Sequence, residues 1–306
     1  MSIRSSIFPC KLKDKVTSKM DNMFNFHAHN IENLLTFQLK AQYLHEKCIY
    51  SRESGTSIDK YSDKDVIVSL TTYGARIYDV YLTIESIMQQ TTRPNKIILW
   101  LDNSFKDKNI PITLTRQINR GLEVNYCNDI LSYKKLIYTL SEYPDDIIIT
   151  VDDDAIYNFD LLENMITEYN RQPDLIYANR MKRIIISKDG IVEKYRKWPH
   201  VNDYEISPLN VPIGVGGVLY PPHALSSEVF NEAFFMENCK FADDIWFKVM
   251  ALKNGTLCKK INTHEPIFYS NQAVQDIALA NQNLFMDRND QQIKRVFDTY
   301  NISSLL

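Results

Sequence analysis

The sequence predicts an α/β protein: a three-layer α/β/α sandwich with a mostly parallel central sheet and helical extensions at both ends. Short apolar runs rich in β-branched residues begin at Val66, Lys96 and Ile147, and they lack the polar alternation of half-exposed strands. Such runs are typical of strands buried on both faces of a sheet. Amphipathic segments separate them, so that strand and helix alternate along the chain. The strands also end in polar or acidic residues, at the edge where open α/β sheets bind ligands.

The first half of the chain follows a β-α-β-(α)-β-α-β order, with right-handed crossovers between parallel strands. Asp79 is a favourable N-cap for the first helix, which must end before Pro94 because proline disfavours helical geometry in the preceding residue. Ser132 caps the helix that precedes the strand at Ile147, and a further helix is expected over 159–169. The strands expected in this half cover residues 66–70, 96–101, 121–126 and 147–151.

The second half mixes short strands with loops. Three of the eight glycines in the chain fall in the segment 211–222, which we expect to be a loop. The other elements expected here are strands over 175–178 and 183–186, a hairpin turn over Ser187–Gly190, a strand over 191–195, a helix over 241–254 and a helical tail over 290–300.

Composition divides the chain into three parts. Residues 1–62 are expected to be a basic, helical extension, because the first twenty residues carry five Lys or Arg against one Asp, and Met23–Cys48 has apolar residues near helical spacing. Residues 63–270 hold the α/β domain, with a first half at 63–157 and a second half at 158–270. Residues 271–306 are expected to form a helical tail.

Charge and cysteine content argue against several classes of protein. The net charge of −3 disfavours a dedicated nucleic-acid binder, which carries a basic surplus. The five cysteines are odd in number and scattered, so they indicate free thiols in a reducing compartment, with neither a disulfide framework nor a zinc site. The sequence shows no apolar run of membrane-spanning length and no signal peptide, which favours a cytoplasmic protein. These features do not predict an oligomeric state.

The stretch 145–157 carries the strongest chemical signal. Its apolar strand ends in Asp152, Asp153 and Asp154. Clustered carboxylates repel one another unless a cation joins them. A hard divalent ion such as Mg²⁺ or Mn²⁺ suits this position, because it is held by one or two carboxylates together with substrate phosphates. The alternative is that the run caps the helix expected at 159–169.

Three further motifs follow in order along the chain: the loop Gly214-Val-Gly-Gly217, the acidic pair Asp243-Asp244 at an expected helix start, and His264. Each motif is weak alone, but four motifs in order, each at a strand or helix boundary, form a specific pattern. Together with Asp152-x-Asp154 they resemble the GT-A nucleotide-sugar glycosyltransferases, and the family 2 type most closely. The resemblance covers about residues 66–269 and implies the GT-A (Rossmann-like) form of the α/β fold.

The resemblance implies a role for each motif. Asp154, Asp152 and His264 would bind the metal, which offsets the charge of a nucleotide diphosphate leaving group. The acidic pair would include the general base that takes the proton of a sugar hydroxyl. Asp244 is the expected base, and Asp243 would bind the acceptor or orient the site. This division stays open, because the chain reads Ala-Asp-Asp where many relatives have Glu-Asp.

The nucleotide-sugar would bind in the half 63–157, and the acceptor and the reaction would lie in the half 158–270. Asp102 would accept a hydrogen bond from a uracil N–H, and Lys134 would contact a phosphate. The other residues that the resemblance implies for donor binding are Thr71, Tyr73, Arg76, Asp152, Asp153, Gly216 and Gly217.

Simpler interpretations stay open for several of these residues. Lys134 and Lys135 form a pair that is usual on a solvated helix face. Trp198 and Trp246 are candidate platforms for sugar stacking, although aromatic residues at these spacings more often belong to the core. A lone histidine such as His264 is commonly structural. The glycine loop also fits a plain tight turn, and the acidic pair a favourable helix dipole.

The sequence therefore predicts a metal-dependent glycosyltransferase of the hexosyltransferase type. It would move a sugar from a nucleotide-sugar, with a UDP-sugar as the expected donor, to a hydroxyl of a glycan or lipid-linked glycan in polysaccharide biosynthesis. Inversion is favoured, because a base is present and no nucleophile stands out. The alternatives are a retaining transferase, a sugar nucleotidyltransferase, whose Gly-x-Gly-Thr-Arg-type loop is missing from 71–76, and a non-catalytic glycan-binding module. The basic N-terminus predicts peripheral contact with the inner face of the cell membrane.

Overall fold

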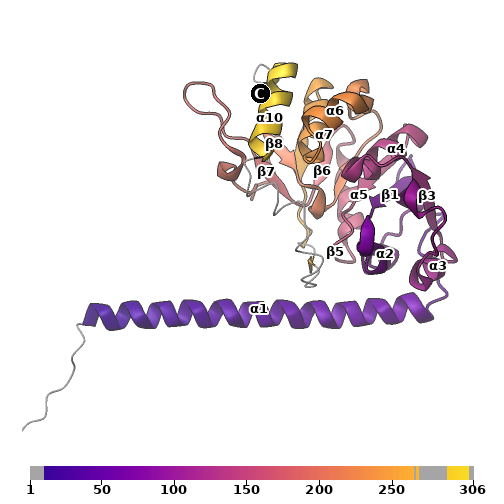
Figure 1. Ribbon diagram of the computed structural model, residues 1–306, viewed down its shortest axis with the longest axis horizontal. Helices are drawn as coiled ribbons and strands as arrows, with labels where there is room; N and C mark the ends of the chain where they lie inside the picture. The colour runs from indigo at the N-terminus through magenta and orange to yellow at the C-terminus, as the bar shows by residue number, and fades with distance from the viewer. Residues whose placement is uncertain (1–9, 265–266, 269–287, 303–306) are drawn as a thin grey trace, which may run out of the picture. The chain divides into compact units, whose positions relative to one another are not determined.

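The computed structural model describes residues 10–264, 267–268 and 288–302 (Figure 1). The chain divides into two compact units, Met1–Tyr43 and Leu44–Leu306, which we describe separately. Helix α1 (Cys10–Tyr50) begins in the first unit and ends in the second, and it confirms and extends the helix expected over Met23–Cys48. Within the residues described, no helix combines the length and the apolar character needed to cross a membrane.

The second unit is built on a seven-stranded sheet in the order β10-β6-β9-β4-β1-β2-β3. Neighbouring strands run parallel except at β9, which is antiparallel to both β4 and β6. This architecture confirms the predicted fold class, a Rossmann-like α/β/α sandwich with a mostly parallel central sheet. The strands of the sheet are β1 (Val66–Thr71), β2 (Lys96–Asp102), β3 (Leu122–Cys127), β4 (Ile147–Thr150), β6 (Ile176–Ala178), β9 (Val218–Tyr220) and β10 (Cys258–Lys260).

Helices cover both faces of the sheet, as expected for strands that are apolar on both sides. Val66, Val68 and Leu70 of β1 pack in one core with helices of the first face, whereas Ile67 packs in another cluster with Trp100. The helices of the first face are α2 (Val80–Met88), α3 (Ile112–Ile118) and α5 (Leu161–Arg171). Those of the other face are α4 (Lys134–Glu142), α6 (Glu232–Asn238), α7 (Asp243–Lys253) and α10 (Arg288–Tyr300), of which the last three lie side by side (Figure 1).

The main correction to the expected fold concerns residues 211–222. The predicted loop contains β9, which lies in the centre of the sheet between β4 and β6, and the end of β8 (Asn210–Pro212). β8 pairs with β7 (Met181–Arg183) in a small separate sheet. Three-residue strands between glycine and proline lack the length and the periodicity by which strands are recognised.

The segment after β7 also differs from the prediction. The turn at Ser187–Gly190 is confirmed, because Gly190 N donates to Ser187 O at 3.0 Å. The strand expected over 183–186 is wrong in position, since β7 covers 181–183. The strand expected over 191–195 is also wrong: it is reduced to an isolated bridge between Ile186 and Val192. Two backbone hydrogen bonds cross this hairpin, from Ser187 N to Ile191 O and from Glu193 N to Ile185 O, both at 2.8 Å, and a 3-10 turn follows over Tyr195–Lys197.

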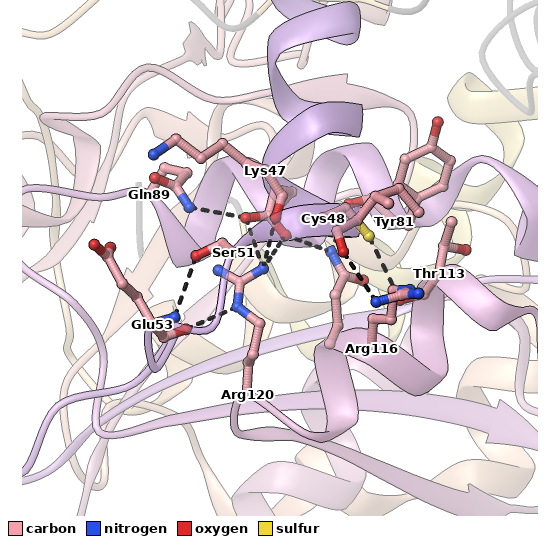
Figure 2. A network of polar contacts seen from close by, with 12 residues as sticks. Lys47, Cys48, Ser51, Glu53, Tyr81, Gln89, Thr113, Arg116 and Arg120 are labelled. Atoms are coloured by element: carbon pink, nitrogen blue, oxygen red, sulfur yellow. Dashed lines mark hydrogen bonds and ion pairs between the residues drawn. The ribbon is translucent and has the colours of Figure 1, made fainter.

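Within the second unit, a buried ion pair contacts the end of α1 through Lys47 O (Figure 2). We call Glu85 and Arg120, together with Gln89 and Gln117, the buried clamp. Arg120 Nη1 lies 3.0 and 2.9 Å from the two carboxylate oxygens of Glu85, and Arg120 Nε donates to Glu53 O at 2.7 Å. Gln89 and Gln117 also donate to Glu85, at 2.8 and 3.1 Å.

The topology gathers the polar strand ends at one edge of the sheet. β1, β2, β3 and β4 are parallel, so their carboxyl ends share that edge. β9 runs the opposite way, and its amino end, which follows the glycine loop, therefore reaches the same edge. A two-stranded antiparallel sheet of β5 (Ala155–Ile156) and β11 (Ile267–Phe268) follows the three aspartates.

Candidate active site

The three consecutive aspartates after β4 bind different partners. Asp153 is buried and accepts hydrogen bonds from Thr72 Oγ1 (2.5 Å) and Arg76 Nη1 (2.6 Å). Arg76 also forms an ion pair with Asp154 through Nη2, at 3.2 Å. Asp153 thus anchors the loop, whereas the side chains of Asp152 and Asp154 stay 30% and 25% exposed. The alternative that the run caps the next helix is wrong, because none of the three residues lies at the start of α5.

Lys135, the second residue of α4, joins two of the acidic segments. Its Nζ lies 2.7 Å from Asp152 Oδ1, as a hydrogen-bonded ion pair, and 3.1 Å from Asp243 Oδ2, as an ion pair without hydrogen-bond geometry. The Lys135 side chain is only 6% exposed. One buried ammonium group therefore connects the end of β4 with the start of α7.

Asp244 is held by the backbone of the glycine loop. The N–H of Gly214 donates to its carboxylate, at 3.1 Å from Oδ1 and 3.2 Å from Oδ2. A Cβ atom on Gly214 would lie 2.8 Å from Lys135 Nζ and 3.1 Å from Asp244 Oδ1, so a larger residue here would displace one of these charged groups. The two carboxylates of the acidic pair thus contact groups outside their own helix, and the loop is more than a plain turn.

The rest of the glycine loop packs tightly against its surroundings. A Cβ on Gly216 would lie 2.6 Å from Arg180 Cβ, and Gly217 has a φ of 83°, in the region that favours glycine. The Tyr157 hydroxyl accepts from Asp152 N and donates to Val215 O, both at 3.0 Å. Tyr157 therefore ties the aspartate loop to the glycine loop.

This group of residues carries more negative than positive charge: five carboxylates, at 152–154 and 243–244, against Lys135 and Arg76. Burial, and then Asp152 and Asp153, raise the pKa of Asp154 to about 6. Burial, and then Asp243, raise the pKa of Asp244 to about 8. Burial lowers the pKa of Lys135, but the surrounding carboxylates outweigh it and hold that pKa well above its ordinary value. A site with such a surplus favours binding of a further cation.

The other predicted donor residues lie along the same edge but outside this group. Thr71 Oγ1 donates to Trp100 O at 2.8 Å, and Asp102 accepts from Ser104 N at 2.9 Å, so both are engaged with their own strand ends. The Tyr73 ring lies 5.1 Å from the Arg76 guanidinium. Both Tyr73 and Asp102 stay partly exposed, and contact with a nucleotide stays a prediction for them.

The burial of side chains decides two alternatives, one for the lysine pair and one for the two tryptophans. Lys134 and Lys135 do not form a solvated helix face, because both are buried. Lys134 lies apart from the acidic group and pairs with Asp129 at 2.6 Å. Trp198 and Trp246 are 2% and 0% exposed, so they belong to the core and the stacking role is wrong.

His264 is exposed, and its backbone rather than its ring contacts Asn179. Its backbone O accepts from Asn179 Nδ2 at 2.9 Å. Across the part of the chain that the structure describes, no group of three or more His, Cys, Asp or Glu side chains is arranged to hold a metal ion. Metal binding by His264 therefore stays a prediction.

The residues present fit a divalent ion that is shared with a ligand. Asp152 and Asp154 offer oxygen donors that are partly exposed within a site of surplus negative charge. Mg²⁺ and Mn²⁺ prefer oxygen donors, and Mg²⁺ is commonly bound by one or two carboxylates plus substrate phosphates.

Sequence reasoning missed two residues of this site. Lys135 was indistinguishable from Lys134, because two adjacent lysines carry no sign of which one faces the sheet edge. Tyr157 gave no motif, and its role depends on the packing of two loops. The helix start expected at Ser132 is also wrong, since α4 begins at Lys134 and its N-cap is Tyr133.

No protein-family model and no curated protein matches the chain. Solved structures give distant similarities. The chain is similar to CMP:2-keto-3-deoxy-manno-octonic acid synthetase complexed with CTP (10% identity, TM-score 0.42, covering 74% of this chain and 100% of that one). It is also similar to the inositol-1-phosphate CTP transferase from T. maritima (9%, 0.40, 72% and 96%) and to S. aureus TarS 1-349 (15%, 0.44, 78% and 72%). Because these identities and TM-scores are low, the fold is assigned from the strand order, and the candidate site is described from the contacts of its own residues.

Proposed function

We propose that this protein is a glycosyltransferase that uses a nucleotide-sugar donor. The observation that carries the proposal is the convergence of Asp152 and Asp154, Gly214, and the pair Asp243-Asp244 at the carboxyl edge of the sheet. Asp152 and Asp244 are 92 residues apart in sequence, and the fold brings their segments within contact distance of one another. Each belongs to a motif that resembles the GT-A glycosyltransferases.

Asp152 and Asp154 form the donor side of the proposed site. A bound Mg²⁺ or Mn²⁺ would supply stabilisation of the charge that develops on a nucleotide diphosphate leaving group. Asp152 and Asp154 would hold the ion together with phosphate oxygens, and the Arg76 contact at 3.2 Å orients Asp154. A UDP-sugar is the donor that we favour.

Asp244 is the proposed general base on the acceptor side. Its pKa of about 8 suits a carboxylate that accepts a proton near neutral pH, and Gly214 N–H fixes its orientation. Asp243 is tied to Lys135, which leaves it to orient the site. An oriented base favours inversion by direct attack of the acceptor hydroxyl on the sugar carbon, with the nucleotide diphosphate leaving.

The test is a screen of nucleotide-sugars for turnover in the presence of Mn²⁺. We expect release of UDP from one UDP-sugar, by hydrolysis or by transfer to an added glycan, and we expect UDP to raise the melting temperature. Release of pyrophosphate from CTP or UTP with a sugar phosphate would instead establish a nucleotidyltransferase. A protein that binds glycans but turns over no nucleotide-sugar would support the binding-module alternative.

Several finer features belong to the same proposal. The acceptor would be a hydroxyl of a glycan or lipid-linked glycan, bound over 158–270, with the nucleotide over 63–157. The basic segment before and within the first turns of α1 would attach the enzyme weakly to the inner face of the membrane. The functional boundaries at 62 and 270, like the role of the tail 271–306, stay predictions.

A further inference from the structure

Two adjacent lysines at the start of α4 share their burial but not their partners. The Lys134 and Lys135 side chains are 2% and 6% exposed. Lys134 pairs with Asp129, whose side chain is 53% exposed, whereas Lys135 lies between Asp152 and Asp243. Neighbouring residues of an α-helix project about 100° apart. We call the five carboxyl groups at 152–154 and 243–244, with Lys135 and Arg76, the acidic site. The Lys135 ammonium group therefore points into the acidic site, and the Lys134 ammonium group points away from it.

Lys135 is the direct link between the donor side and the acceptor side of the site. Asp152 belongs to the loop after β4, and Asp243 is the first residue of α7. With Nζ at 2.7 and 3.1 Å from these carboxylates, the ammonium group offsets a repulsion that would otherwise separate the two segments. An ammonium group has three donors and no fixed plane, so it can bind carboxylates from several directions.

The glycine loop, through Gly214, also lies against the Lys135 ammonium group. A Cβ on Gly214 would lie 2.8 Å from Lys135 Nζ, 3.1 Å from Asp244 Oδ1 and 3.4 Å from Asp152 Oδ1. Gly214 N–H binds Asp244 from the same loop. The positions of Lys135, Asp152 and Asp244 are therefore linked at one point, and displacement of the ammonium group would displace the carboxylates on both sides.

We propose that Lys135 is a positioning residue for the transfer reaction: it holds the donor-side Asp152 and the acceptor-side pair Asp243-Asp244 in one geometry. The inference rests on the proposed function, and it adds a residue that none of the sequence motifs contains. Lys135 contacts the side chains that act on the substrates, and it touches neither the sugar nor the acceptor in this role.

Lys135→Met tests the proposal, with Lys248→Met as the control. Both changes remove a buried ammonium group, and that of Lys248 lies on α7 beside Cys258 Sγ, at 3.7 Å, outside the acidic site. Binding of UDP in the presence of Mn²⁺, measured by titration calorimetry, counts the competent sites, and hydrolysis of the UDP-sugar is then expressed per site. We expect Lys135→Met to lower turnover per site on the order of 100-fold, the effect of misplacing a catalytic group by about 1 Å. Lys248→Met should stay close to wild type.

Gly214→Ala provides a second variant that keeps every charge. The Gly214 backbone is outside the positive-φ region, so alanine is compatible with the fold, and its Cβ would meet only the site. We expect it to lower turnover per site in the same direction. If Lys135→Met does not fold, turnover per site in Gly214→Ala still tests the positioning role of Lys135.

The outcomes separate the inference from the proposed function. Equal turnover per site in the two lysine variants, or a wild-type value for Gly214→Ala, overturns the inference while the proposed function stands. If Lys135→Met loses UDP-binding sites in the same proportion as total turnover, the role of Lys135 is purely structural, and the inference is also overturned. A wild-type protein that neither binds UDP nor turns over any nucleotide-sugar overturns the proposed function, and the inference falls with it.

Discussion

Two of the clusters of buried charge in the protein, the buried clamp and the acidic site, are built differently. In the buried clamp, one carboxylate, Glu85, faces one guanidinium, Arg120, and two glutamines add neutral donors. In the acidic site, five carboxylates face Lys135 and Arg76, and part of the acidic surface stays open. The first arrangement balances its charges and holds the chain together.

The difference in charge balance between the two clusters indicates which of them is functional. A buried charge without a matching partner is costly, so a fold keeps a surplus of like charges only where some other requirement maintains it. The clamp connects the segment around Glu53 to the domain through Arg120 (Figure 2), which is a structural task. The surplus at the acidic site matches a metal ion and a nucleotide diphosphate acting together. Five predictions test this division between a structural and a functional cluster, in order of decreasing effect.

Asp154→Asn should abolish divalent-dependent nucleotide binding without unfolding the protein, because the residue lies at the strand mouth and its side chain is partly exposed. Calorimetric titration with UDP, with and without Mn²⁺, measures the effect. Asp129→Asn, which removes a carboxylate outside the acidic site, is the control. Unchanged turnover in Asp154→Asn, or full wild-type activity in excess chelator, would remove the metal from the proposal.

Asp244→Asn should lower transfer by a factor on the order of 10²–10⁴, the usual contribution of a positioned general base. The amide keeps its size and its place beside Gly214 but cannot take a proton. Donor affinity should survive, so the loss should appear in kcat. If Asp243→Asn is the crippling change and Asp244→Asn is mild, the roles of the pair are reversed.

Arg120→Met should lower the free energy of unfolding by about 3–5 kcal/mol, because it leaves the Glu85 carboxylate buried without its cation. Urea denaturation measures the loss. Lys96→Met, which breaks the partly exposed pair with Glu123, should cost only about 0–1 kcal/mol. Turnover per folded molecule should not change in either variant. A small loss in Arg120→Met would mean that the clamp is not a structural element.

The stability of the acidic site should depend on pH through Asp244. Burial and Asp243 raise its folded pKa to about 8 from an ordinary 3.8, and Lys135 and Gly214 oppose them. The folded protein thus binds this proton more tightly, so the stabilisation is complete below about pH 4 and is lost as pH rises through about 8. Asp244→Asn cannot ionise and should gain stability relative to wild type from pH 5 to pH 8, as measured by urea denaturation. A difference that is independent of pH contradicts the expected shift.

Removal of residues 1–20 should have the smallest effect and should leave both charge clusters unchanged. These residues carry five Lys or Arg against one Asp, and each basic residue near an anionic membrane contributes about 1 kcal/mol. We expect the full chain to sediment with anionic liposomes in low salt and the shortened chain to stay in solution. Equal sedimentation of both forms argues against membrane attachment through this segment.

The order of the helices and strands, and the polar residues at the strand ends, could be predicted from the sequence. The strands β1, β2 and β4 are apolar runs that can only be buried, so their positions and the acidic residues after them were predictable. Helix α7 was marked at its start by Asp243-Asp244 and at its end by Asn254. These signals are local, because hydrophobic spacing and capping are properties of neighbouring residues.

The way in which these strand and helix ends meet depends on long-range packing and could not be predicted from local sequence patterns. β9 is three residues long, and it becomes a central strand because β4 and β6 offer hydrogen-bonding groups on both sides of it. The same contacts carry the glycine loop to Asp244 and select Lys135 over Lys134 as the cation of the site. Such choices depend on residues distant in sequence, since the packing of the whole sheet sets which side chain points inward.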